Sequence, residues 1–117
     1  MPHIVLNGHV NLDDIFNGFK GILLRNDQGI LKTANIYISH DKGTILIESL
    51  AIEKDGKHTF LAMISRRNDG VVVRIYPGSE VEKTSAVKRV LSEIAKQLLG
   101  MFPQLTIGET NLLEYLK

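Results

Sequence analysis

Apolar and polar residues alternate with a period of two along much of the chain. The clearest case is segment 44–66, in which two apolar-rich runs flank the dipeptide Asp55-Gly56. Asp-Gly between two such runs is a strong signal for a β-hairpin, because both residues of the tight turn need a positive φ. The segment therefore predicts two antiparallel strands, over residues 44–54 and 57–66.

Similar turn residues divide the sequence on both sides of this hairpin. The turns 26–29, 41–43 and 68–70 each end in glycine, which adopts a positive φ without the steric cost of a Cβ atom. Short loops between consecutive strands are typical of an antiparallel meander. The predicted strands of this meander are 22–25, 30–40, 44–54, 57–66 and 71–76.

The N-terminal residues predict one more strand and a short helix. Residues 2–10 alternate, with Ile4 and Leu6 on the same side of a strand. Residues 11–18 then place apolar side chains at helical spacing, with Asn11 as the N-cap. This helix would have about two turns.

Beyond the meander, the apolar residues take the spacing of a long helix over residues 80–99. Ser79 and Glu82 have the spacing of a capping box at its start, and Gly100 follows its end. A helix of this length is roughly 30 Å long, enough to cross several strands. The tail after Leu105 is compatible with a short strand and with one or two final helical turns. The apolar stripe of the long helix comprises Val87, Val90, Leu91, Ile94, Ala95, Leu98 and Leu99.

These elements predict a single α+β domain over residues 1–117. A five- to six-stranded antiparallel meander sheet is covered on one face by the long C-terminal helix, and a short N-terminal helix follows the first strand. The chain is long enough to bury a hydrophobic core of its own.

The predicted loop lengths also assign side chains to the two faces of the sheet. A two-residue loop at Asp55-Gly56 pairs Ala51 with Phe60 and places them on the same face. The opposite face is mostly aliphatic, and we expect the long helix to cover it. Its aliphatic members are Leu46, Leu50, Ile52, Leu61 and Met63, joined by Ile36, Ile38, Val71, Val73 and Ile75 from the neighbouring strands.

A second register remains open for the last hairpin. With a three-residue loop at 68–70, Val73 lies under the helix and Arg74 lies on the other face. A two-residue loop at Asp69-Gly70 exchanges these two positions. We prefer the first register, because it collects the aliphatic side chains beneath the helix.

Composition narrows the classes of function. The 117 residues are 44% hydrophobic and 23% charged, with a formal net charge of +1, which fits neither a disordered chain nor a strongly basic nucleic-acid-binding protein. No run of 18 apolar residues and no signal-peptide pattern is present, so we expect a cytoplasmic protein with no membrane partner. The absence of cysteine excludes disulfides, thiolate metal sites and a cysteine nucleophile.

The face opposite the predicted helix is the main candidate for function. It mixes aromatic and arginine side chains with isoleucines, which is too apolar for bare solvent and too polar for a dry core. We expect a homo-oligomer contact there, or cover from the N-terminal strand and helix; a single-stranded nucleic acid and a small apolar ligand are the alternatives. The candidate binding residues are Tyr37, Phe60, Arg66, Arg67, Arg74 and Tyr76.

Catalysis and metal binding have weaker support. Glu48 stands alone among the leucines of the predicted helix-covered face, where a buried, unpaired carboxylate is one mark of a functional acid. We expect instead that it lies outside the helix contact, solvated or paired. His3 and His9 share one side of a strand but are roughly 20 Å apart, too far to bind one ion. The sequence therefore predicts a non-enzymatic binding or assembly module without a metal or cofactor.

Overall fold

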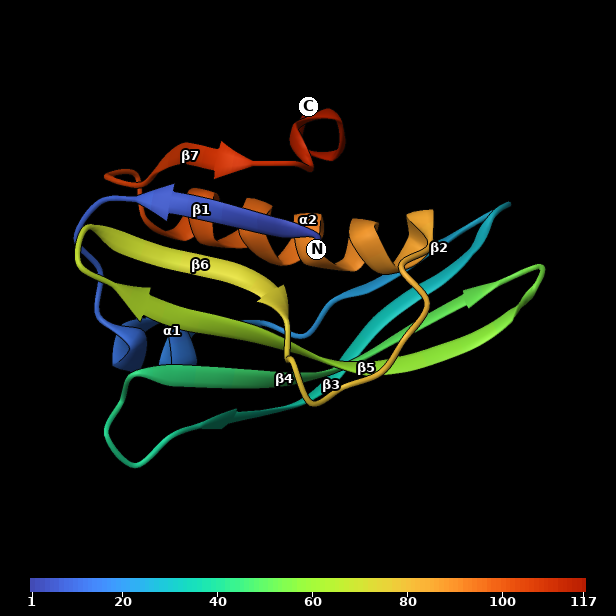
Figure 1. Cartoon of the computed structure of the whole chain (residues 1–117), viewed down its shortest axis with the longest axis horizontal. Coiled ribbons are helices and arrows are strands. Elements are labelled where there is room, and N and C mark those ends of the chain that lie inside the picture. Colours follow the sequence, from blue (N-terminus) through green and yellow to red (C-terminus); the bar gives the residue numbers. More distant parts are fainter.

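In the computed structural model, which describes all residues from Met1 to Lys117, seven antiparallel strands form one curled sheet (Figure 1). The strands follow the order β2-β3-β4-β5-β6-β1-β7 across the sheet. In chain order the elements are β1 (His3–Asn7), α1 (Leu12–Gly18), β2 (Leu23–Asn26), β3 (Gly29–Ile38), β4 (Thr44–Glu53), β5 (Gly56–Arg67), β6 (Gly70–Ile75), α2 (Ser85–Met101), β7 (Thr106–Thr110) and the 3₁₀ helix η1 (Leu113–Leu116).

Helices α1 and α2 lie on the same side of the sheet. Figure 1 is seen from the other side, so that β1 and β6 pass in front of α2. The apolar side of α2, with Leu91, Ile94 and Leu98, is fully buried in the core. Leu12 and Ile15 of α1 belong to the same core. None of the helices is long and apolar enough to cross a membrane.

The α+β class, the antiparallel sheet and the short helix after the first strand are confirmed. The predicted strand count is wrong: the sheet has seven strands rather than five or six, because the tail adds β7 and β1 lies between β6 and β7. Ile4, Val5 and Leu6 of β1 are all buried, as befits a strand with neighbours on both sides. The tail after Leu105 forms both the strand β7 and the short helix η1.

Helix α2 begins later than the sequence predicts. Its N-cap is Thr84, whose hydroxyl accepts a hydrogen bond of 3.2 Å from the Val87 N–H. Ser79 has a different role, because its hydroxyl accepts a bond of 3.1 Å from the Leu61 N–H. Strand β6 ends at Ile75, so this side-chain bond satisfies a donor of β5 beyond the last ladder pair.

The predicted choice of the helix-covered face is wrong, because α2 covers the opposite side of the β4–β5 hairpin. Gly56 begins β5 opposite Glu53, so the pairing differs by two residues from the predicted one. Phe60 pairs with Ser49 rather than with Ala51, and it lies in the core at 5% exposure. A shift of two residues leaves each side chain on its face. The error therefore concerns only which face the helix covers.

Side-chain shape and charge explain which face α2 covers. The covered side carries β-branched and small residues, which let a helix pack close to the sheet. The other side carries Glu48, whose carboxylate would lose its hydration without gaining a cation if α2 covered it. The covered positions on β4 to β6 are Ile45, Ile47, Ser49, Ala51, Phe60, Ala62, Ile64, Val71, Val73 and Ile75.

Strand β3, which precedes the hairpin, also pairs in a register that differs from the predicted one. The Ser39 N–H donates to the Thr44 carbonyl, so the loop between β3 and β4 has four residues rather than three. Ile36 pairs with Ile47 and Ile38 pairs with Ile45, which turns both isoleucines of β3 toward α2.

Relative to β5, the strand after the hairpin has the faces of the second register, because Val73 shares a face with Ile64 and Arg74 shares a face with Met63. Val73 nevertheless lies beneath α2 and Arg74 on the other face, because the helix covers the Ile64 side rather than the predicted Met63 side. The loop itself is Asn68-Asp69, because Gly70 already belongs to β6. Gly70 has a φ of +157°, and a Cβ atom there would lie 1.9 Å from the Leu6 carbonyl oxygen, so β1 can approach only a glycine.

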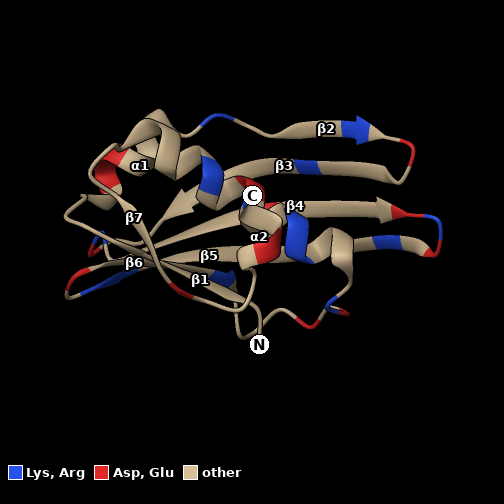
Figure 2. Cartoon of the chain, turned by 90° about the horizontal axis from the view of Figure 1, so that it is seen from above, with Lys and Arg blue, Asp and Glu red and all other residues tan.

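Charged residues lie mostly at strand ends, in turns and along α2, and the centre of the sheet is largely uncharged (Figure 2). On α2 the two signs are interspersed, with an ion pair of 3.0 Å between Lys96 and Glu93. Exposed pairs of this kind contribute little to stability. The fold therefore depends on apolar packing between α2 and the sheet.

Two neighbouring residues of β4 test the assignment of the faces. We expect Ile47→Ala to lower the free energy of unfolding by about 2–5 kcal/mol, because it leaves a cavity beneath α2. Leu46→Ala, on the uncovered side, should lower it by less than about 1.5 kcal/mol. Urea denaturation at low protein concentration measures both values. A larger loss for Leu46→Ala than for Ile47→Ala would overturn the assignment.

Candidate functional site: the open face of the sheet

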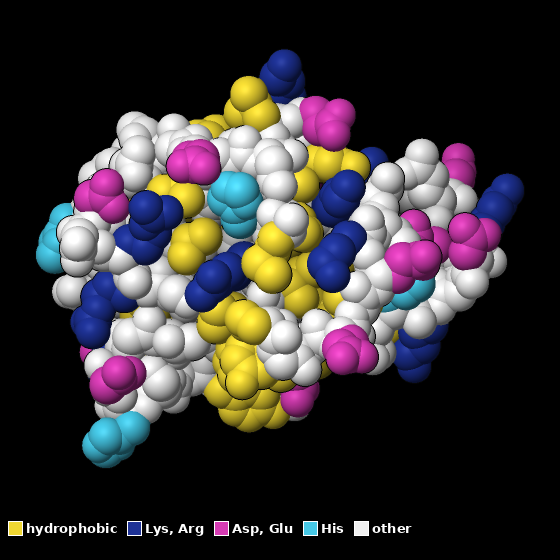
Figure 3. Space-filling model, in the orientation of Figure 1, with side chains coloured by type: hydrophobic (Ala, Val, Ile, Leu, Met, Phe, Trp, Pro, Cys, Tyr) yellow, Lys and Arg dark blue, Asp and Glu magenta, His cyan; other side chains and the backbone are white.

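No helix covers the side of the sheet opposite α2, which we call the open face. Figure 3 shows this side, with hydrophobic side chains in a band across its middle and Lys and Arg side chains around them. Tyr37 and Tyr76 are the most exposed of its large hydrophobic side chains, at 49% and 38%. The open face comprises His3, Val5, Tyr37, Leu46, Glu48, Leu50, Leu61, Met63, Val72, Arg74 and Tyr76, with Lys32, Lys57 and Arg67 toward its ends.

Cross-strand pairs arrange these side chains in rows. One row runs across five strands, from Tyr37 on β3 through Leu46, Met63 and Arg74 to His3 on β1. Side chains directly opposite each other in antiparallel strands contact one another, with Cβ atoms about 4.5–5.5 Å apart. The row therefore has an aromatic end, an apolar middle and a cationic end.

Glu48 lies in the next row, opposite Leu61, and its carboxylate is held in place by β3. The Asn35 amide Nδ2 donates to Oε1 at 2.9 Å, and the Tyr37 hydroxyl donates to Oε2 at 3.0 Å. The bond to Glu48 and the negative charge of that carboxylate raise the pKa of the Tyr37 hydroxyl above its ordinary value of 10.0. Glu48 is thus outside the α2 contact and hydrogen-bonded, as expected, and a catalytic role for it stays the alternative hypothesis.

Arg74, at the other side of the apolar middle, has no ion-pair partner within its own chain. Its guanidinium Nε is buried and makes no hydrogen bond. Native proteins rarely leave a buried donor unpaired, because it loses its hydration without compensation. Because Arg74 is only half-buried as a whole and no acid lies beside it, its charge is available to an anionic group.

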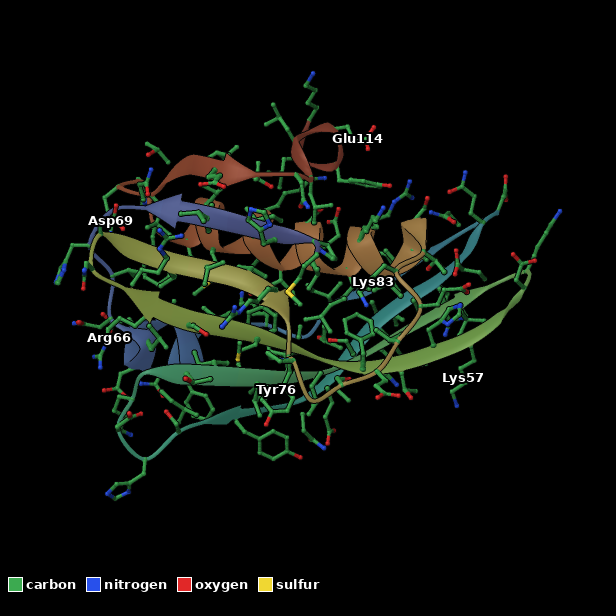
Figure 4. All side chains as sticks on the ribbon, in the orientation of Figure 1. Lys57, Arg66, Asp69, Tyr76, Lys83 and Glu114 are labelled. Atoms are coloured by element: carbon green, nitrogen blue, oxygen red, sulfur yellow. The ribbon has the colours of Figure 1, made fainter.

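A shallow groove of about 490 Å³ crosses the open face beside Glu48. Leu50 and Leu61 contribute its apolar lining, and Lys32 and Lys57 contribute cations. Figure 4 shows Lys57 on the projecting end of the β4–β5 hairpin, away from Tyr76 near the middle of the face. A cleft with an apolar lining and a few charged groups is suited to a partner that presents both kinds of group.

The structure brings four of the six predicted binding residues to the open face and removes two. Tyr37, Arg74 and Tyr76 lie near its middle and Arg67 lies at its end. Phe60 is in the core beneath α2.

The prediction that Arg66 and Arg74 share a face is also wrong, because the two side chains point to opposite faces of the sheet. Arg66 lies beside the loop after β3 (Figure 4), where its charge acts on Asp41. The Ser39 hydroxyl donates to Asp41 at 2.7 Å and the Gly43 N–H donates at 3.0 Å. These two bonds, with a smaller effect of Arg66, lower the pKa of Asp41. Arg66 thus belongs to a structured turn rather than to the open face.

The group formed by Asn35, Tyr37 and Glu48 is absent from the sequence-based prediction. That prediction places Glu48 on the face opposite the other two. A β-bulge in β3, between Thr33 and Ile36, and the four-residue loop together bring all three to one face. The signal that was available is Glu48 itself, a carboxylate in an otherwise apolar strand.

The four histidines do not gather with acidic residues at one place. No three side chains among His, Cys, Asp and Glu lie together in the way that metal ligands would. His3 is 4.0 Å from Glu109, and His58 is 3.2 Å from Glu53. Both are pairs of one histidine and one carboxylate.

Comparison with protein-family models, with curated proteins and with solved structures finds no match for this chain. A functional proposal for the open face therefore depends on its own geometry and chemistry.

The bond between Tyr37 and Glu48 predicts a specific pH dependence. We expect Glu48→Ala to lower the pKa of Tyr37 toward 10.0, and Glu114→Ala, which removes a carboxylate on η1, to leave it unchanged. In the native protein this bond favours the protonated tyrosine of the folded state. Its contribution to stability is therefore present at neutral pH and is lost as the pH rises through the folded-state pKa. NMR titration of the Tyr37 ring carbon, assigned with Tyr37→Phe, measures the shift; an unchanged titration in Glu48→Ala would show that the bond does not form in solution.

Proposed function

We propose that the protein is a non-enzymatic binding or assembly module, and that its open face is the contact surface for a second copy of the same chain. The observation that carries the proposal is the apolar middle of this face. Leu46, Leu50 and Leu61 are half-buried neighbours on β4 and β5, Met63 among them is buried at 6% exposure, and half-buried Val72 continues the patch onto β6. Contiguous apolar surface of this kind usually marks a contact site in a protein that is otherwise normal in composition.

The dimensions of the molecule support this proposal. The chain measures 39 × 30 × 24 Å, and the open face is one of its broad sides. A standard protein–protein interface buries about 800 Å² on each partner. The broad side of this molecule has room for such an interface, with an apolar centre and a charged rim, which is the usual arrangement of residues.

A substitution at the centre of the patch tests self-association. Leu61→Asp should raise the dimer dissociation constant by at least about 30-fold, because it buries a carboxylate among apolar side chains. Leu113→Asp is the matched control, since Leu113 is 51% exposed on η1. Sedimentation velocity over a range of micromolar concentrations measures the association of both variants and of the native chain. Circular dichroism checks that each variant is folded.

Two outcomes would contradict the proposal. One is a native chain that stays monomeric at tens of micromolar. The other is a dimer that Leu61→Asp leaves intact, because the contact would then lie elsewhere on the molecule.

Single-stranded nucleic acid is a second candidate for the same face, favoured by its charge. Lys32, Lys57, Arg67 and Arg74 outnumber the single carboxylate of Glu48 there. Two exposed tyrosines on the same face offer surfaces on which bases can stack.

A pair of double variants tests this second candidate. Arg67→Ala with Arg74→Ala should weaken binding to a fluorescent single-stranded oligonucleotide. It should also reduce the slope of the logarithm of affinity against the logarithm of salt concentration by the amount expected for the loss of about two phosphate contacts. Arg66→Ala with Arg89→Ala removes the same charge away from the open face and should leave binding nearly unchanged. Fluorescence anisotropy at several salt concentrations measures both. Equal losses of affinity in the two double variants would show that binding depends on net charge alone and not on the open face.

A further inference from the structure

We infer that two copies pair symmetrically through the open face, with Arg74 of each copy bound to Glu48 of the other. This inference rests on the proposed self-association and names the polar contact that fixes its geometry. In a symmetric dimer the same patch is used by both copies, so a residue i that contacts j is matched by a j that contacts i. One base and one acid on either side of an apolar centre meet that requirement.

The sheet register places the two residues on either side of β5. Glu48 on β4 is opposite Leu61, and Arg74 on β6 is opposite Met63. Two strand spacings and a two-residue offset put their Cα atoms about 12 Å apart. The midpoint between them lies on β5, between Leu61 and Met63, at the apolar centre of the face.

A two-fold axis that runs between the two sheets, passes over this midpoint and is perpendicular to the Glu48–Arg74 line places Arg74 of each copy over Glu48 of the other. Each arginine then faces a carboxylate of the other copy, and the apolar side chains of the two copies meet around the axis. One rotation thus forms two Arg74–Glu48 pairs and buries the apolar patch of both copies.

Each of the two groups lacks what the other supplies. Arg74 has no acid within ion-pair distance in its own chain. Glu48 accepts one neutral hydrogen bond on each oxygen and has no cation within ion-pair distance, although Lys32 and Lys57 line the same groove. A carboxylate oriented in this way can still accept the paired N–H groups of a guanidinium.

The apolar surroundings make this pairing selective. When two open faces meet, both charges leave water, and an unpaired charge in such a contact costs far more than a paired one. Other orientations of the two sheets would bury Arg74 or Glu48 against leucines. The symmetric orientation is the one that pairs both charges, so it is favoured over its competitors.

Charge exchange between two variants tests the contact. Arg74→Glu alone places two acids on each copy, and Glu48→Arg alone places two bases, so each variant should dimerise at least about 10-fold more weakly than the native chain. An equimolar mixture of the two restores opposite charges at both contacts and should form a mixed dimer. Native mass spectrometry identifies the mixed dimer by mass, and sedimentation velocity gives the association constants.

Two controls accompany the mixture. A chain with both substitutions exchanges the signs within each contact and should recover self-association, which shows that the single variants are not simply misfolded. Arg89→Glu lies on α2, away from the open face, and should dimerise as the native chain does.

The outcomes separate this inference from the proposal on which it rests. If Leu61→Asp breaks the dimer but the single exchanges do not weaken it, the open face is the contact and the Arg74–Glu48 pairing is wrong. If both single variants weaken the dimer and their mixture does not restore it, the two residues do not face each other. A native chain that remains monomeric refutes the proposed self-association itself.

Discussion

The packing of α2 against the β-branched and small side of the β4–β5 hairpin is the contact on which the structure depends. Ile47 and Ile64 on the sheet and Ile94 on the helix are fully buried in it. Because side chains alternate along each strand, this one choice assigns every residue of the paired strands to the core or to the open face. Glu48 and Arg74 are at the surface for the same reason that Ile47 and Val73 are inside.

The local elements of the fold could be predicted from the sequence, and the pairing between them could not. Turn residues and periodicity are signals within a few positions, and they located the meander, α1 and the presence of a long helix. The error in register arises at glycines such as Gly56, which follows its loop as the first residue of a strand instead of lying in the turn. The choice of face failed because Leu46, Leu50 and Leu61 are as apolar as the isoleucines on the other side. The position of β1 between β6 and β7 joins distant parts of the chain, and no local pattern indicates it.

For the candidate site, too, the sequence predicts what local patterns determine and misses what strand pairing determines. The prediction that Tyr37, Arg74 and Tyr76 lie on one uncovered surface is correct. Phe60 and Arg66 are wrongly assigned to that surface, because they lie on the side of β5 that α2 covers. The polar group around Glu48 depends on a β-bulge in β3, and a bulge at Ala34 and Asn35, with no glycine or proline there, leaves no clear mark in the sequence. Geometry, rather than composition, makes this surface a candidate: it places one acid and one base on opposite sides of an apolar patch.

The position of the amino terminus has a practical and a biological consequence. Met1 is 68% exposed, and its neighbours include Tyr76, His3 and Arg74, so the chain begins at the rim of the open face (Figure 1). Its carbonyl accepts a bond of 2.8 Å from the Asn111 side chain, which holds it there. An affinity tag or a fusion partner joined to Met1 would begin beside this surface. The amino terminus is therefore a position from which access to the open face can be blocked without altering a single residue of the sheet.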